Sequence, residues 1–291
     1  MAGLSSLMAP RRLDTLKVRR NFSRQATEYE RHAVVQRRVA ERLLQLLLEG
    51  GLVGGPALEI GAGTGYLLHR LRRLCPGVRP VISDLAHAMT CQAAARLPQV
   101  PAVDADAQAL PLRCASLSLV VSSSVYQWVE DLPLAFAEIA RVLQPGGRFA
   151  IALFGARTLH ELRDSHRRGA AEAGRHPSHA LDFPDRSTVA DALAAAGFTR
   201  YRLQVAEEWE FYSTAPELLR HLKQIGALNA ATDRPPGLAS RQVMQRLAAH
   251  YERFRQDGKL PATYQVIYVL GRKTRGVLPG GEIKAPAAPR T

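Results

Sequence analysis

The chain has 291 residues, of which 46% are hydrophobic, and carries a formal net charge of +13. Single cores stop growing near ~250–300 residues, so this length favours one domain with an added lobe. No apolar run approaches the ~18–20 residues that cross a bilayer, and residues 1–12 lack the apolar segment of a secretion signal. Cys75, Cys91 and Cys114 are an odd number without metal-ligand spacing. We therefore expect a cytoplasmic protein with no membrane contact, no disulfide and no metal.

The first elements in chain order are a basic lead and a long helix. Residues 1–20 are basic and we expect them to be flexible. From Ser23 to Glu49 apolar residues recur at helical spacing, which predicts one helix capped by Ser23. A run of glycines with Pro56 ends that helix and introduces the first strand. The helix is therefore available to lie over a ligand as a lid.

A glycine-rich turn follows the first strand. The run Ala57-Leu58-Glu59-Ile60-Gly61-Ala62-Gly63-Thr64-Gly65 takes an apolar strand through Gly-x-Gly-x-Gly into a helix. Glycines leave no Cβ between the backbone and a ligand, and the amides at a helix start face a polar ligand. The spacing differs from the Gly-x-Gly-x-x-Gly of dinucleotide binders, and Glu59 favours a cationic ligand over a pyrophosphate. S-adenosylmethionine is the predicted cofactor, with Glu59, Gly61, Ala62, Gly63 and Gly65 as its first candidate contacts.

Acidic residues follow the next two strands. The strand Val78–Ser83 ends at Asp84, 19 residues after Gly65, where a doubly wound fold places an acceptor for ribose hydroxyls. A third strand near Val100–Val103 leads to Asp106, which we predict to accept from the adenine amine. Either acid alone is a common helix cap or loop residue. The further candidate cofactor contacts near these strand ends and the next one are Leu85, Met89, Ala107 and Ser123.

The alternation of strands and helices predicts the fold. Strands at Leu117–Ser123 and Arg148–Leu153, the second preceded by the turn Gln144–Gly147, continue a parallel sheet with right-handed crossovers. The predicted helices are Tyr66–Leu74, Ala86–Leu97 and Leu132–Leu143. This layout over residues 55–155 matches the Rossmann-like class I methyltransferases, whose α/β fold has a seven-stranded, mostly parallel sheet.

The second half of the chain supplies the remaining elements. We predict helices at Thr158–Ala173 and Ser187–Ala196 around a loop His176–Pro184, then a sixth strand at Tyr201–Glu208. Two or three short helices from Ser213 to Phe254, broken at Asp233–Gly237, form a cap before an antiparallel last strand, Tyr264–Leu270. The expected division is a lead (1–20), a helical lid (21–55), a cofactor-binding core (56–210), an inserted cap (211–258), the last core strand (259–272) and a disordered tail (273–291).

Four segments resemble one family. They are Arg20–Ala33 with the following Gln36, Val125–Trp128, Leu222–Ala227 and Leu260–Tyr264. Over about Asn21–Val269 the chain is similar to the malonyl-acyl-carrier-protein O-methyltransferases that open pimelate synthesis for biotin. The resemblance implies methylation of the free carboxylate of a malonyl thioester, carried on acyl carrier protein or on coenzyme A.

The resemblance also implies candidate catalytic residues. Tyr29 would close over the cofactor or substrate, Gln127 and Trp128 would shape the pocket beside the methyl group, and Lys223 and Tyr264 would contact the acyl group or its arm. Each has a plainer alternative, since Tyr29 and Trp128 can be packing residues and Lys223 a solvated one. The family is expected to use a basic residue for the malonyl carboxylate, but an arginine-rich chain does not single one out. His176 and His179 are interpreted as surface residues rather than metal ligands.

The positive charge points to an acidic partner, and we predict acyl carrier protein rather than nucleic acid, since no RNA-binding pattern is present. We expect a monomer.

One alternative is the same fold acting on RNA or a small metabolite. Another is an assembly factor or hydroxylase, as in the similar mitochondrial complex I assembly protein, in which case residues 1–20 would pass for a transit peptide. Scattered arginines on solvated helix faces would account for the charge equally well.

Overall fold

The computed structural model describes residues 13–174, 183–227 and 241–274. Its centre is a seven-stranded sheet in the order β3-β2-β1-β4-β5-β7-β6. Strands β2, β1, β4 and β5 pair in parallel, as do β3 and β2, whereas β7 is antiparallel to both neighbours, β5 and β6. The bounds are β1 Gly55–Ile60, β2 Val78–Asp84, β3 Ala102–Asp104, β4 Leu117–Ser123, β5 Leu143–Phe154, β6 Tyr201–Tyr212 and β7 Leu260–Arg272. The sheet confirms the predicted fold class.

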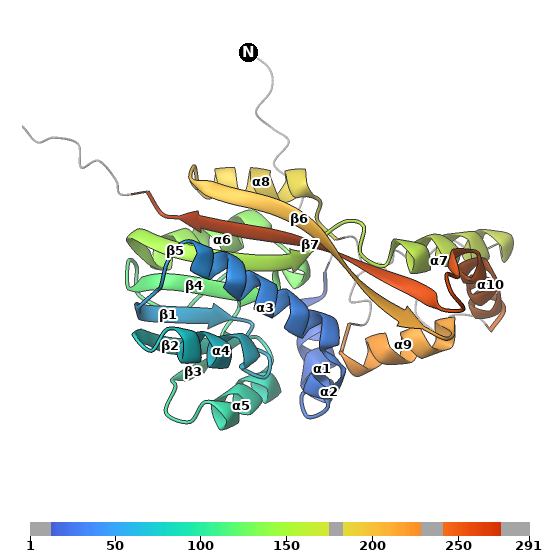
Figure 1. Ribbon diagram of the computed structural model, residues 1–291, viewed down its shortest axis with the longest axis horizontal. Helices are drawn as coiled ribbons and strands as arrows, with labels where there is room; N and C mark the ends of the chain where they lie inside the picture. Colours follow the sequence, from blue (N-terminus) through green and yellow to red (C-terminus); the bar gives the residue numbers. More distant parts are fainter. Residues whose placement is uncertain (1–12, 175–182, 228–240, 275–291) are drawn as a thin grey trace, which may run out of the picture.

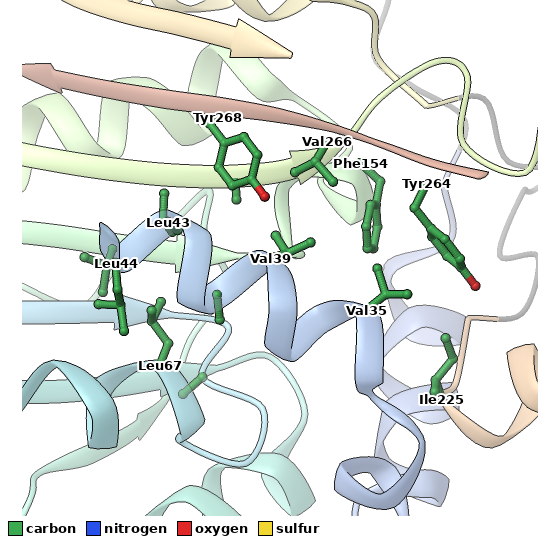
Figure 2. Close-up of a cluster of buried hydrophobic side chains, with 14 of the residues drawn as sticks. Val35, Val39, Leu43, Leu44, Leu67, Phe154, Ile225, Tyr264, Val266 and Tyr268 are labelled. Carbon is green, nitrogen blue, oxygen red and sulfur yellow. The ribbon is translucent and has the colours of Figure 1, made fainter. Parts of the chain in front are cut away.

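Helices cover both faces of the sheet (Figure 1). One apolar cluster joins the sheet to α3 (Val34–Glu49), α4 (Tyr66–Leu74) and α5 (His87–Arg96). A second cluster joins the opposite face to α6 (Leu132–Val142) and α8 (Arg186–Ala195). Strands buried on both faces need apolar residues at successive positions, as at Ala57 and Leu58 of β1 and at Leu119–Val121 of β4. Figure 2 shows the first cluster, in which Val35, Val39 and Leu43 of α3 face β7.

The N-terminal segment forms three helices instead of the one predicted. They are α1 (Thr15–Gln25), α2 (Tyr29–His32) and α3. The cap of α1 is Asp14, whose carboxylate accepts from the Lys17 amide at 3.0 Å. The helix therefore begins within the lead that was expected to be flexible. Ser23 lies inside α1 and is not its cap. Ala33 leaves helical geometry at ψ 50°. Apolar periodicity reports which face is buried and not whether the helix is continuous, so the breaks left no sequence signal.

The last two strands reach beyond the rest of the sheet. Strand β6 pairs with β7 over its whole length, whereas β5 pairs only with the Val266–Arg272 half of β7. Helices α9 (Ala215–Gln224) and α10 (Arg241–Tyr251) with the turn η2 (Glu252–Phe254) lie between β6 and β7 in the chain and form the predicted cap beside α7 (His160–Glu172), as Figure 1 shows. Both strands are longer than predicted, because their outer halves pack on the cap as well as on each other.

Several expectations differ in detail or fall elsewhere. The predicted turn Gln144–Gly147 lies within β5, where the register against β4 shifts between Leu117 and Leu119. His176, His179, the Asp233–Gly237 break and residues 275–291 lie outside the described residues. Among the described helices, none is long and apolar enough to span a membrane.

Candidate functional site

The glycine turn between β1 and α4 uses its three glycines in different ways. All three have positive φ, which favours glycine: 66° at Gly61, 55° at Gly63 and 74° at Gly65. A Cβ on Gly61 would overlap the Val125 side chain, and one on Gly63 would lie 3.8 Å from the Tyr29 ring. A Cβ on Gly65 would press on Ala93 at 3.3 Å. Gly65 therefore permits α4 to pack on α5 and does not line the cavity, and its contact with the cofactor stays a prediction.

Glu59 supports the turn from below. It is buried, and its carboxylate accepts from the Leu68 amide in the first turn of α4 at 3.1 Å. Burial raises the pKa of Glu59 well above its ordinary value. Neither Glu59 nor Ala62 lines the cavity. The Ala62 amide donates instead to the Ser83 carbonyl at 2.9 Å. In this structure Glu59 and Ala62 shape the turn, and their direct contacts with a cationic ligand stay a prediction.

Asp84 lies at the end of β2 and lines the cavity. One carboxylate oxygen accepts from the Gly63 amide at 2.9 Å and the other from the Ala86 amide at 2.8 Å. These bonds join the glycine turn to the start of the next helix. Burial raises the pKa of Asp84 to about 6, although the two amides act in the opposite direction. Carboxylate lone pairs remain for a ligand, because each oxygen has room for more than one donor.

The cavity above these residues, here called the nucleotide cavity, has a volume of about 720 Å³. Asp106 contributes a carboxylate that accepts from the Gln108 amide at 2.9 Å. Most of the predicted contacts line the cavity: Tyr29, Gly61, Gly63, Asp84, Leu85, Met89, Asp106, Ala107, Ser123 and Trp128.

The lid side of the nucleotide cavity comes from α1 and α2. The Phe22 ring lies 5.5 Å from that of Trp128 and 6.3 Å from that of Tyr29, both edge to face. Glu30 next to Tyr29 pairs with Arg96 of α5 at 2.5 Å, which holds this segment on the core. Burial raises the pKa of the Tyr29 hydroxyl, with Asp84 adding to the effect, so the phenol stays neutral. These aromatic rings exclude water from the space above the turn.

A second cavity of about 460 Å³, here called the acyl cavity, adjoins the first. Phe22, Tyr29, Ser124 and Trp128 line both. The other lining residues are Gln36, Gln127, Phe154, Thr158, Leu159, Phe183, Leu222, Ile225, Ala227 and Tyr264. Because the cavities share four residues, a group in one lies beside a group in the other.

The acyl cavity is neutral in the part that the structure describes, because no charged side chain lines it. The basic residue expected for the carboxylate is therefore not found among the described lining residues. Lys223 is exposed on α9 and lines neither cavity, so the structure does not place it where the prediction required. Tyr264 is buried against Phe154, their rings 5.5 Å apart, and Figure 2 shows both beside Ile225.

Gln127 organises the loop between the cavities. Its amide nitrogen donates to the Ser124 carbonyl at 2.7 Å, and its amide oxygen accepts from the Phe154 amide at 3.2 Å. Gln127 is fully buried, so these bonds hold the end of β4 against the end of β5. Its position on the acyl cavity agrees with the prediction, and its hydrogen bonds indicate a positioning role.

Ser124 is a residue that the sequence reasoning missed. It lines both cavities with φ 60°, a left-handed conformation that serine adopts at a cost. Its backbone amide donates to the Ala152 carbonyl at 2.8 Å, whereas its buried hydroxyl has no hydrogen-bond partner in the described part of the chain. The signal was a run of three serines at a strand end, of which only Ser123 was selected. Gln36 and Phe22 lay within the quoted N-terminal motif but were not selected either.

The described residues contain no cluster of three metal-ligating side chains. The sheet order, the glycine turn and the carboxylates after β2 and β3 define a class I methyltransferase that uses S-adenosylmethionine. Residues 58–151 match the family model described as a methyltransferase domain. Among solved structures the chain resembles the YcgJ protein of Bacillus subtilis, with a TM-score of 0.57, 16% identity, and coverage of 81% of this chain and 100% of that one. A putative methyltransferase of Bacillus halodurans also has a TM-score of 0.57, with 17% identity and coverage of 80% of this chain and 98% of that one.

Curated relatives identify the particular family. A malonyl-[acyl-carrier protein] O-methyltransferase of Geobacter sulfurreducens is 42% identical, covering 90% of this chain and all of the relative. Another from Methylovorus is 37% identical over 96% of both chains. A third, from Halorhodospira halophila, is 39% identical over 88% of this chain and 87% of the relative. The chain belongs to the malonyl-[acyl-carrier protein] O-methyltransferase family, which confirms the resemblance found in its motifs.

Proposed function

We propose that this protein methylates the free carboxylate of a malonyl thioester carried on acyl carrier protein, with S-adenosylmethionine as the methyl donor. The observation that carries the proposal is the pair of adjoining cavities, one lined by nucleotide-binding signals and one neutral and closed by the cap. The family assignment over nearly the whole chain supports the same substrate.

The residues of the nucleotide cavity fit the cofactor. Asp84 presents a buried carboxylate suited to two ribose hydroxyls, and Asp106 presents one suited to an exocyclic amine. Gly61 and Gly63 keep the turn free of side chains where a ligand approaches. When bound, S-adenosylmethionine supplies an electrophilic methyl group on a sulfonium. Asp84 is the residue on which the fit depends most.

The neutral acyl cavity suits a carboxylate acceptor. A carboxylate is ionised at neutral pH, so its methylation requires no general base and releases no proton. The positive charge of the sulfonium and the negative charge of the carboxylate cancel as the methyl group is transferred. A site of low polarity favours this loss of charge. Neutral donors hold the carboxylate without the strong ion pair that would oppose its attack. The attacking oxygen must come within about 3–3.5 Å of the methyl group. Phe22 and Tyr29 line both cavities and so lie where the donor and the acceptor would meet.

The direct test combines purified protein with malonyl-carrier and methyl-labelled S-adenosylmethionine. We expect label in a base-labile methyl ester on the acyl group, detected by mass spectrometry of the carrier. Acetyl-carrier, which lacks the free carboxylate, is the matched control and should stay unlabelled. Label found only in RNA, or no label with any malonyl thioester, would contradict the proposal. Complementation of a biotin-requiring strain that lacks this methylation step tests the pathway.

The proposal includes a cytoplasmic monomer that recognises the carrier by charge. Sedimentation should then give a particle near the chain mass of 31.9 kDa. A larger species at micromolar concentration would replace the monomer by an oligomer without changing the reaction.

A further inference from the structure

A third hollow, outside both cavities, lies between α7 and η2. Its described lining consists of His160, Arg163, Asp164 and Arg167 from α7 with Arg253 and Phe254 from η2, and its volume is about 760 Å³. We call it the arginine groove. It belongs to no part of the site described above, and the family motifs do not include it.

The arginine groove carries an excess of positive charge. Asp164 is the one acidic residue in the described lining, and three guanidinium groups converge on it: those of Arg167 and Arg253, which line the groove, and that of Arg168, which lies beside it. Arg167 lies 3.5 Å from Asp164 and Arg168 3.4 Å, and Arg253 makes the shortest contact of the three. One carboxylate neutralises one of these charges. At two sites near the N-terminal helices, by contrast, Glu41 pairs with Arg70 and Glu30 with Arg96 one to one.

Some guanidinium groups at the arginine groove are held in place and others are exposed. Arg253 is held between two partners, since its guanidinium carbon lies 4.6 Å from the centre of the Phe254 ring and the group also pairs with Asp164. Arg163 and Arg167 are one helical turn apart and so share a face of α7. The side chain of Arg167 is 65% exposed and that of Arg168 is 55% exposed. This is the form of a surface that binds an anionic partner.

The arginine groove is next to the acyl cavity. Leu159 lines the acyl cavity, and the next residue, His160, lines the groove. The Arg163 guanidinium lies 6.0 Å from the centre of the Phe183 ring, which also lines the acyl cavity. A macromolecule held at the groove therefore has a short path for a flexible acyl arm into that cavity.

We infer that the arginine groove docks the acidic surface of the acyl carrier protein, with Arg167, Arg168 and Arg253 as the principal contacts. The inference rests on the proposed function and assigns it a binding surface. Opposite charge at the rim of an interface accelerates encounter and is screened by salt. The groove thus recognises the carrier protein, whereas the acyl cavity recognises the malonyl group.

The test compares two substrates that carry the same acyl group. One is malonyl-carrier, and the other is malonyl-N-acetylcysteamine, a small thioester without a protein. The variant R167Q/R168Q removes two charges and keeps polar side chains at both positions, and R167E/R253E reverses two. We expect kcat/KM for malonyl-carrier at low salt to fall about tenfold in the first and further in the second, with a smaller loss at high salt. Activity on the small thioester should change less than twofold.

The matched control is R72E/R73E on α4, where both arginines are exposed and line none of the three hollows. It changes the net charge by the same amount as R167E/R253E. Thermal unfolding of every variant identifies loss of folding. Equal losses in the control, equal losses on both thioesters, or no loss in the groove variants would each overturn the inference.

A binding measurement separates this inference from the proposed function. Malonyl-carrier is titrated into each protein loaded with S-adenosylhomocysteine, and the dissociation constant is read by fluorescence anisotropy. Weaker carrier binding in R167Q/R168Q supports docking at the groove even if the wild-type protein transfers no methyl group. A wild-type protein that methylates the small thioester but shows unchanged carrier binding in both groove variants retains its proposed function and loses this docking surface.

Discussion

The two cavities of this protein are built in different ways. The nucleotide cavity comes mainly from successive strand ends of one sheet, so most of its residues follow in chain order from Ile60 to Val129, and the N-terminal helices add Thr15, Val18, Phe22 and Tyr29. The acyl cavity gathers residues from the N-terminal helices, the ends of β4 and β5, α9 and β7. Local sequence signals therefore locate the first cavity, whereas the second depends on how distant segments pack. The sheet thus supplies most of the walls where a cofactor would bind, and the added helices supply most of the walls around the group that would receive the methyl.

The largest expected effect tests the nucleotide cavity. Asp84→Asn replaces an acceptor of charge-assisted hydrogen bonds, each of which is worth about 1.5–3 kcal/mol. We expect the dissociation constant for S-adenosylmethionine, measured by calorimetry, to rise by about ten- to a hundredfold. Asp104→Asn is the matched control, because Asp104 pairs in register with Asp84 at the end of β3 but does not line the cavity. Equal losses in the two variants would remove Asp84 from the cofactor site.

The second prediction separates ligand approach from helix packing within one turn. Gly65→Ala places a methyl group 3.3 Å from Ala93 at a positive φ, so we expect the free energy of unfolding to fall by about 1–3 kcal/mol in urea titrations. Gly63→Ala meets only the Tyr29 ring at 3.8 Å and should lose less stability. It should weaken cofactor binding more than Gly65→Ala does, once both are measured on folded protein. The reverse order would contradict the division of roles among the glycines.

The third prediction follows from the pKa of Asp84, which burial raises to about 6. The ionised carboxylate is the form that accepts from ribose hydroxyls, so cofactor affinity should decrease about tenfold between pH 7 and pH 5. The effect on folding has the opposite sign: since the unfolded pKa is near 3.9, this group favours the folded apo protein most at low pH, and stability is lost as pH rises through 6. Asp84→Asn should abolish both contributions. A wild-type affinity that is flat from pH 5 to 7 would contradict it.

The smallest expected effect concerns the wall between the cavities. Ser124→Ala removes the hydroxyl and keeps the Cβ in its left-handed conformation, whereas Ser124→Gly removes the hydroxyl and the strain together. If the hydroxyl donates to the acceptor carboxylate, both variants should lose about five- to tenfold in kcat/KM for malonyl-carrier, corresponding to about 1 kcal/mol for a neutral hydrogen bond. Ser122→Ala is the control, because the Ser122 hydroxyl donates to the Ile60 carbonyl within the sheet. Full activity in Ser124→Gly would show that the loss of kcat/KM in Ser124→Ala comes from backbone strain and not from the missing hydroxyl.

The same contrast explains what could be predicted from the sequence. The parallel strands and the carboxylate Asp84 follow from alternation and spacing, which are local properties. The antiparallel last strand follows from the class I methyltransferase layout that these elements match. The roles of Glu59 and Gly65 required the packing of α4, since the same motif permits either ligand contact or helix support. Lys223 belongs to the segment Leu222–Ala227, which does line the acyl cavity, but its own side chain lies on the exposed side of α9. The unpaired hydroxyl of Ser124 became visible only when β4 and β5 were brought together.

Strand β7 belongs to both halves of the molecule. Its Val266–Arg272 portion is hydrogen-bonded to β5 in the centre of the sheet, and its outer portion carries Tyr264 into the wall of the acyl cavity (Figure 1). The strand therefore holds the wall of the acyl cavity at a fixed distance from the core of the sheet. Exchanging the helices between β6 and β7 would alter the choice of acceptor, while β7 would keep that distance unchanged.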